Sequence, residues 1–215
     1  AKEIKTLIGD SVDKVTAVMP ALVSSLTEDY WMTAARAIMT TDTLPKGISR
    51  TLTVGGKTVT ITGIAKGSGM IHPNMATMLG YIATDAKVDA ALLQQLLSDI
   101  TDETFNCVTV DGDTSTNDAL VLLATGASGV DIVSADSASF RSALKEACLF
   151  LAQAIVRDGE GATKFIDIQV EQARSKEEAH TVANTVALSP LVKTALFASD
   201  PNWGRILAAV GRSPI

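Results

Sequence analysis

The sequence has few of the residues that carry common catalytic chemistry. It contains two histidines, two cysteines and 4% aromatic residues in a chain of 215 residues. His72 and His180 are far apart, and neither has acidic residues around it at metal-ligand spacing. A zinc site or a Ser-His-Asp triad is therefore poorly supported, and we expect no metal site. The scarcity of aromatic rings means that aliphatic side chains and alanine must form the core.

The two cysteines do not indicate a disulfide framework. Cys107 and Cys148 both stand among apolar residues, in FNCVTV and KEACLFLA. We therefore expect two buried free thiols in a reducing compartment, and a cytoplasmic protein.

Long apolar runs and an excess of positive charge are also missing. No apolar run reaches the roughly 18 residues of a membrane span, and the start AKEIKTLIGD lacks the basic and apolar regions of a signal peptide. The formal charge of −6 and the pI of about 4.9 argue against a large nucleic-acid surface. We expect neither nucleic acid nor a membrane as a partner.

Apolar periodicity predicts helices and strands that alternate along an ordinary globular chain, 47% apolar and 20% charged. Two β-branched runs around Gly55-Gly56 predict a hairpin. Pro20 is expected to kink or split the first helix. We infer an α/β fold of packed layers. The predicted helices are 11–26, 28–38, 90–100, 139–157, 177–188 and 202–210, and the other predicted strands are 79–83, 104–113, 117–126 and 165–170.

The segment AKGSGM, residues 65–70, places a lysine beside two glycines. A P-loop needs its lysine after the glycines, and a dinucleotide fingerprint needs a third glycine, so neither motif applies. Gly67 and Gly69 permit close backbone approach. We interpret the segment as a turn that presents Lys66 to a pocket.

Two acidic turns follow. DGDTSTND, residues 111–118, is similar to a calcium loop, but Thr116 and Leu122 stand where that loop requires glycine and glutamate. We interpret it as a tight turn held by Asx-type bonds, architectural or lining a site. DGEGATK, residues 158–164, puts Glu160 between two glycines after a predicted helix. It is either a helix-ending turn or a carboxylate that pairs with a substrate ammonium.

The stretch GMIHPNMATMLGYIATDA, residues 69–86, contains the pair Ala76-Thr77. A threonine hydroxyl is a poor nucleophile without an adjacent base. A cut directly before Thr77 would supply one, because the new α-amine, with a pKa of about 7.7–8.0, lies next to the hydroxyl. Such a site would need no histidine. From the residues alone, Thr77 can equally cap or line the start of a strand.

Five long motifs span nearly the whole chain: AIMTTDTLPK at 37–46, KGSGMIHPNMATML at 66–79, TFNCVTVDGDTSTND at 104–118, VRDGEGATKFI at 156–166 and LVKTALFASDPNWGRILAAVG at 191–211. In order and approximate spacing they resemble the bifunctional ornithine acetyltransferases (glutamate N-acetyltransferases) of arginine biosynthesis.

The resemblance implies self-cleavage between Ala76 and Thr77. Thr77 would then carry an acetyl group from N-acetylornithine to glutamate as an acetyl-threonine ester. The substrate-binding residues implied are Lys66, Thr77 and Glu160, and their charges suit an amino acid's carboxylate and amine. No cofactor is implied, although some members use acetyl-CoA as donor. The implied assembly is a heterotetramer of two α and two β chains.

The fold implied is a four-layer α/β/β/α sandwich that resembles the N-terminal-nucleophile hydrolases, with the family's own connectivity. Residues 1–76 would be the C-terminal part of the upstream α chain, and 77–215 the downstream β chain, together forming one structural domain. Lys5-Thr6 stand where the family has its oxyanion-hole pair, so the oxyanion hole is not assigned.

Two other functions stay open at this point. One is a related N-terminal-threonine aminohydrolase, in which water removes the acyl group. The other is a truncated, non-catalytic remnant that binds an amino acid or a partner.

Overall fold

The computed structural model describes residues 2–72, 78–133 and 137–215. The helices are α1 Lys2–Ser24, α2 Trp31–Ala37, α3 Ala90–Asp102, α4 Ser137–Arg157, α5 Lys176–Ala187, α6 Pro190–Phe197 and α7 Trp203–Val210, with short 3-10 turns η1 Glu28–Tyr30 and η2 Phe105–Cys107. The strands are β1 Lys46–Val54, β2 Lys57–Lys66, β3 Leu79–Thr84, β4 Lys87–Val88, β5 Ala119–Ala124 and β6 Asp131–Ile132.

The main sheet of the described residues has four strands in the order β1-β2-β3-β5. Strands β1, β2 and β3 are antiparallel neighbours, and β5 runs parallel to β3. The predicted hairpin is confirmed: Gly55 and Gly56 join β1 to β2 with φ values of 56° and 79°. Positive φ at both central residues is what a two-residue type I′ turn requires, and glycine adopts it without strain.

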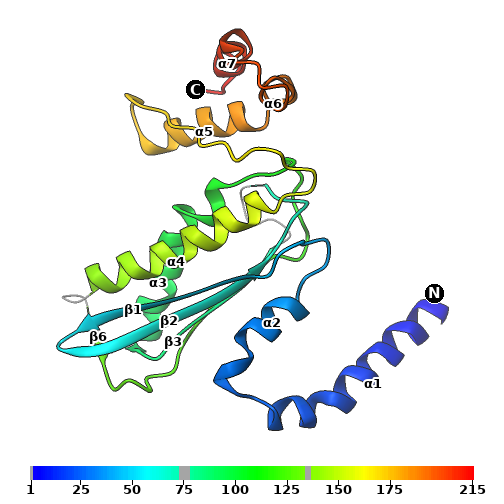
Figure 1. The fold of residues 1–215 in the computed structure, drawn as a ribbon, viewed down its shortest axis with the longest axis vertical. Coiled ribbons are helices and arrows are strands. Elements are labelled where there is room, and N and C mark those ends of the chain that lie inside the picture. The colour runs from blue at the N-terminus through cyan, green and yellow to red at the C-terminus, as the bar shows by residue number, and fades with distance from the viewer. Residues whose placement is uncertain (1, 73–77, 134–136) are drawn as a thin grey trace.

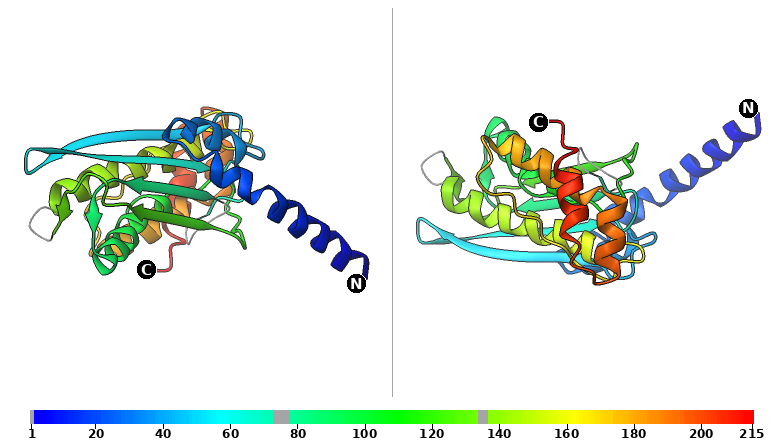
Figure 2. Two further views of the ribbon diagram at one scale, coloured as in Figure 1. Left: turned by 90° about the horizontal axis from the view of Figure 1, so that it is seen from below. Right: turned by 90° about the horizontal axis from the view of Figure 1, so that it is seen from above.

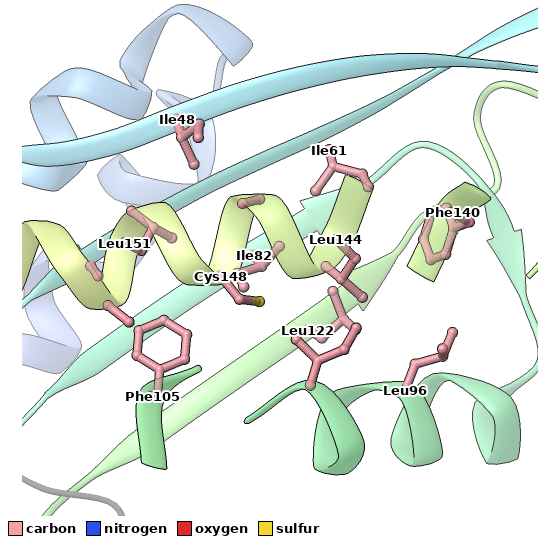
Figure 3. Packing of buried hydrophobic residues seen from close by; sticks show 14 of the residues in the cluster. Ile48, Ile61, Ile82, Leu96, Phe105, Leu122, Phe140, Leu144, Cys148 and Leu151 are labelled. Carbon is pink, nitrogen blue, oxygen red and sulfur yellow. The ribbon is translucent and has the colours of Figure 1, made fainter. Parts of the chain in front are cut away.

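The core lies between this sheet and α4, which packs on β1 and β2 with α3 beside it. Figure 1 shows α4 on one side of the sheet and α2 on the other. Aliphatic side chains fill the core, as expected from the scarcity of rings, and Figure 3 shows Ile61, Ile82, Leu144 and Leu151 among them. Gly63 lets α4 come close, because a Cβ there would lie 3.1 Å from Leu151 and 3.2 Å from Ile82.

Helix α1 projects away from the rest of the molecule, as both views in Figure 2 show. The predicted helix is confirmed, but the break expected at Pro20 is wrong, since α1 runs without interruption from Lys2 to Ser24. Pro20 removes one backbone donor, and the unpaired carbonyl one turn earlier can bond water, because the side chains of residues 12–24 are all exposed.

The C-terminal helices α5, α6 and α7 pack on one another around Val186, Val192 and Ala209. Each begins at a side-chain cap: Ser175, Ser189 and Asn202 accept hydrogen bonds from backbone N–H groups of the first turn. These caps satisfy donors that a helix start otherwise leaves free.

Two predicted strands and one predicted burial are wrong. Residues 104–113 contain η2 and no strand, and 165–170 join no ladder in the described part of the chain. Local alternation of apolar residues cannot create a strand without a neighbour to pair its backbone. Cys148 is buried as predicted, whereas Cys107 is exposed at the end of η2. Neither is in a disulfide. Among the described helices, none is long and apolar enough to cross a membrane.

Candidate active site

Lys66 is the last residue of β2, where the sheet ends. In this strand Ile61, Gly63 and Ala65 are buried, so the alternation of side chains directs Lys66 to the other face of the sheet. Lys66 pairs in register with Leu79, the first residue of β3. It therefore lies beside the point where the chain leaves the segment 73–77.

Glu160 lies against the glycine loop that follows Lys66. Its backbone N–H donates to the carbonyl of Ser68 at 2.8 Å, and the Ser68 hydroxyl donates to the carbonyl of Asp158 at 2.7 Å. A Cβ added at Gly69 would lie only 2.8 to 3.0 Å from the carboxyl atoms of Glu160. The Glu160 carboxylate thus occupies the space that any side chain at position 69 would need.

The acidic turn 111–118 holds both flanks of the segment 73–77. Before the segment, Asp111 accepts hydrogen bonds from the backbone N–H groups of Met70 at 2.7 Å and Ile71 at 3.0 Å. After it, Asp118 accepts from the N–H of Met78 at 2.9 Å. The predicted Asx-type bond is present, from the Asp113 N–H to Asp111 at 3.0 Å. The motif therefore anchors the chain on each side of Ala76-Thr77.

Asp118 also lies in the electrostatic field of Lys66. Burial raises the pKa of the Asp118 carboxyl, and the N–H of Met78 together with the positive charge of Lys66 only partly opposes this. Among the described residues, none makes a hydrogen bond or an ion pair with the Lys66 ammonium or with the Glu160 carboxylate.

Behind the loop lies a buried ion cluster, which we define as Asp42, Lys46 and Asp158. The Lys46 ammonium lies 2.6 Å from Asp42 Oδ1 and 2.6 Å from Asp158 Oδ2. Burial alone would raise the pKa of each carboxyl, but the hydrogen bonds from Lys46 and from backbone N–H groups outweigh it. Both pKa values are held below the ordinary range, so the carboxylates are ionised at neutral pH.

A cleft of about 620 Å³ includes Glu160 in its lining. Its walls come from η2, the C-terminal half of α4, the segment 160–170, and helices α5 and α6. They are mostly apolar, with Lys193 among the exceptions. Burial lowers the pKa of Lys193, and its ammonium donates to the carbonyl of Val110.

Of the residues predicted for the site, the structure places Lys66 and Glu160, and it joins their two segments through Ser68. Ala76 and Thr77 lie outside the described residues. Within the described ranges, no group of three or more His, Cys, Asp or Glu side chains lies close enough together to hold a metal ion. His180 contacts the carbonyl of Asn106 through Nε2 at 3.2 Å.

The ion cluster is not predicted by the sequence motifs. Asp42 and Lys46 lie in AIMTTDTLPK, and Asp158 begins DGEGATK. Nothing in either motif indicates that their charged side chains meet. A charged residue next to an apolar run looks like a surface residue when read alone. Only the fold brings residues 42 and 158 together.

Comparisons with known proteins identify the family of this chain. The model of the ArgJ family matches residues 7–215. An arginine biosynthesis bifunctional protein ArgJ from Methylococcus capsulatus is 58% identical over 205 residues, which are 94% of this chain and 50% of that protein. The chain thus spans about half the length of this relative.

A solved structure of an ArgJ protein has a fold similar to that of this chain. The crystal structure of arginine biosynthesis bifunctional protein ArgJ from Bacillus halodurans superimposes with a TM-score of 0.61 at 49% identity, covering 62% of this chain and 64% of that chain. The predicted α/β fold is therefore confirmed. The chain belongs to the ArgJ family of arginine biosynthesis proteins.

Proposed function

We propose that this chain carries the nucleophile segment of a glutamate N-acetyltransferase, which moves an acetyl group from N-acetylornithine to glutamate. One observation carries the proposal: the Lys66 loop contacts the Glu160 turn at the flank of Ala76-Thr77. A cation and an anion at one loop suit a substrate that has both a carboxylate and an amine. Membership of the ArgJ family supports the same reaction class.

The proposal begins with hydrolysis of the peptide bond between Ala76 and Thr77, in which one water is consumed and a carboxylate is left on Ala76 and an amine on Thr77. Thr77 then has a free α-amine next to its hydroxyl, and at neutral pH a fraction of that amine is unprotonated. The amine accepts the hydroxyl proton while Oγ attacks the acetyl carbonyl carbon of N-acetylornithine. The C–N bond breaks, ornithine leaves with the proton, and an acetyl ester remains on Thr77.

The second acetyl transfer returns the cleaved enzyme to the state with a free Thr77 hydroxyl. The amine of glutamate attacks the ester carbonyl, the C–O bond breaks, and the Thr77 oxygen regains a proton. In both acetyl transfers Lys66 attracts the carboxylate of the bound amino acid, and in the transfer from N-acetylornithine Glu160 attracts the free side-chain ammonium of the donor. Acetyl-CoA as a second donor and an assembly of two α and two β chains complete the proposal.

The decisive experiment combines denaturing mass spectrometry with an acetyl-transfer assay. The wild-type protein should give two pieces that meet at Ala76-Thr77 in place of a 22.4 kDa chain, and it should make N-acetylglutamate. Thr77→Ala should leave one uncut, inactive chain. Thr51→Ala, which changes an exposed threonine of β1, is the control and should behave like the wild type.

Three results would contradict the proposal. An uncut wild-type chain with full transferase activity would exclude Thr77 as the nucleophile. Release of acetate without transfer to glutamate would identify an aminohydrolase. Binding of N-acetylornithine in a calorimeter with no turnover by the cleaved protein would identify a non-catalytic binding protein.

A further inference from the structure

Lys46 is a buried lysine that the proposed chemistry does not use. It is 3% exposed, at the first position of β1. Its ammonium has three acceptors: Asp42 Oδ1 at 2.6 Å, Asp158 Oδ2 at 2.6 Å and the carbonyl of Leu44 at 3.3 Å. An ammonium has three donors, so this side chain is fully satisfied.

A gain in folding stability does not by itself explain why the protein buries these three charges. Burial of a charge is costly, and an apolar side chain of similar volume often serves a protein core equally well. One cation between two carboxylates also leaves a net negative charge in the interior. What a buried charge with fixed partners does provide is a single geometry, because any displacement leaves a charge unpaired.

That geometry extends directly to the two segments of the candidate site. Asp42 Oδ1, which binds Lys46, also accepts the N–H of Gly67 at 2.7 Å, so it holds the residue next to Lys66. Asp158 begins the turn that carries Glu160, and its carbonyl accepts the Ser68 hydroxyl at 2.7 Å. The carboxylate of Asp42 therefore links Lys46 to the Lys66 loop. The carboxylate of Asp158 binds Lys46, Thr43 and Leu44, while its backbone carbonyl accepts the Ser68 hydroxyl, so Asp158 links the cluster to the Glu160 turn through the backbone.

We propose that Lys46 is a positioning residue that fixes the spacing between Lys66 and Glu160, and thereby the length of amino acid that the site accepts. The inference rests on the proposed function of these two residues. Lys46 does not touch the substrate. It acts through Asp42 and Asp158, whose carboxylates its ammonium bridges at 2.6 Å each.

The test compares two donors that differ in one methylene, N-acetylornithine and N-acetyl-2,4-diaminobutyrate. In Lys46→Gln, the ratio of kcat/KM for the longer over the shorter donor should fall at least tenfold, chiefly through KM for N-acetylornithine. Lys46→Arg, which keeps the charge, should recover part of the ratio. Lys87→Gln is the matched control, because Lys87 pairs with Asp131 on the surface and its side chain is 70% exposed.

Backbone hydrogen exchange gives a readout that does not depend on turnover. In Lys46→Gln, the amides of Gly67 and Glu160 should exchange at least tenfold faster, because the first donates to Asp42 and the second to Ser68. The amide of Ile82 in β3 should not change. If Lys46→Gln does not fold, Asp42→Asn replaces it, because this variant weakens the bond between Lys46 and the carboxyl group that holds Gly67 and should lower the donor ratio in the same direction.

The outcomes separate the two proposals. Lack of acetyl transfer by the wild type refutes the proposed function, whereas amide exchange still tests whether Lys46 holds the two segments. With an active wild type, an unchanged donor ratio in a folded Lys46→Gln protein overturns the positioning role. Loss of activity in proportion to the unfolded fraction, with the ratio constant, overturns it as well.

Discussion

Replacement of Gly69 by alanine adds one methyl group next to the Glu160 carboxylate and therefore tests where that carboxylate lies. A Cβ at this residue would meet Oε1, Cδ and Oε2 of Glu160 at 2.8, 2.9 and 3.0 Å, whereas ordinary contacts begin at 3.4 Å. The Glu160 carboxylate must then move by ~0.5 Å, because the methyl carbon is fixed to the backbone. The φ of Gly69 lies outside the left-handed region, so alanine adds no backbone strain of that kind.

The change should affect ligand binding more than folding. Glu160 is an exposed, flexible side chain that can swing aside at little cost, and Gly→Ala at a compatible site stabilises by about 0.4–1 kcal/mol. We expect the free energy of unfolding of Gly69→Ala to stay within about 1 kcal/mol of the wild type. A displaced carboxylate should lose about 1–2 kcal/mol of a charge-assisted hydrogen bond, which is a roughly 5- to 30-fold higher KM for N-acetylornithine.

The assay is a double-mutant cycle with Glu160→Ala. In that background no carboxylate remains to be displaced, so Gly69→Ala should change KM by less than about twofold. Gly47→Ala is the control, because its Cβ would meet Ile64 at an ordinary 3.6 Å. Equal effects of Gly69→Ala in both backgrounds, or an unchanged KM in the wild-type background, would refute the reasoning.

Three further predictions concern the core, the ion cluster and the thiols. Leu144→Ala removes a fully buried side chain and should lower the free energy of unfolding by about 2–5 kcal/mol in urea titrations. Although burial raises the pKa of Asp42 and Asp158, their hydrogen bonds hold both below the unfolded value of about 3.9. Their stabilisation is thus complete above about pH 5 and lost as the pH falls through the folded values; a constant urea midpoint from pH 6 to about pH 2 would contradict this. Exposed Cys107 should react with a thiol reagent in the native protein, whereas Cys148, whose pKa burial raises to about 12, should react only after unfolding.

Local patterns predicted the elements that local chemistry determines. The hairpin follows from Gly55-Gly56 between β-branched runs, and α4 from a long amphipathic pattern that ends at Asp158-Gly159. Both signals lie within a few residues of the structure that they form. The run 165–170 shows the limit, because a strand also needs a partner, and its sequence does not encode the position of one.

The sequence likewise predicted one part of the candidate site and not the other. Lys66 and Glu160 were predicted from motif resemblance, and the structure shows their segments in contact through Ser68 and Gly69. The ion cluster was not predictable, because Lys46 meets Asp158 across 112 residues of sequence. Asp111 was assigned to a turn, but its bonds to Met70 and Ile71 depend on a contact 41 and 40 residues away.

The main sheet contains strands from both sides of the bond between Ala76 and Thr77. Strand β2 precedes that bond and β3 follows it, yet residues 61–66 pair along their whole length with residues 79–84. Helix α4, from the downstream side, packs on β1 and β2 from the upstream side. Two polypeptides cut at this bond would therefore share one sheet and one core, and neither could complete its fold alone. Separately produced halves should remain unfolded until mixed, and a nicked protein should migrate as one particle until a denaturant separates the pieces.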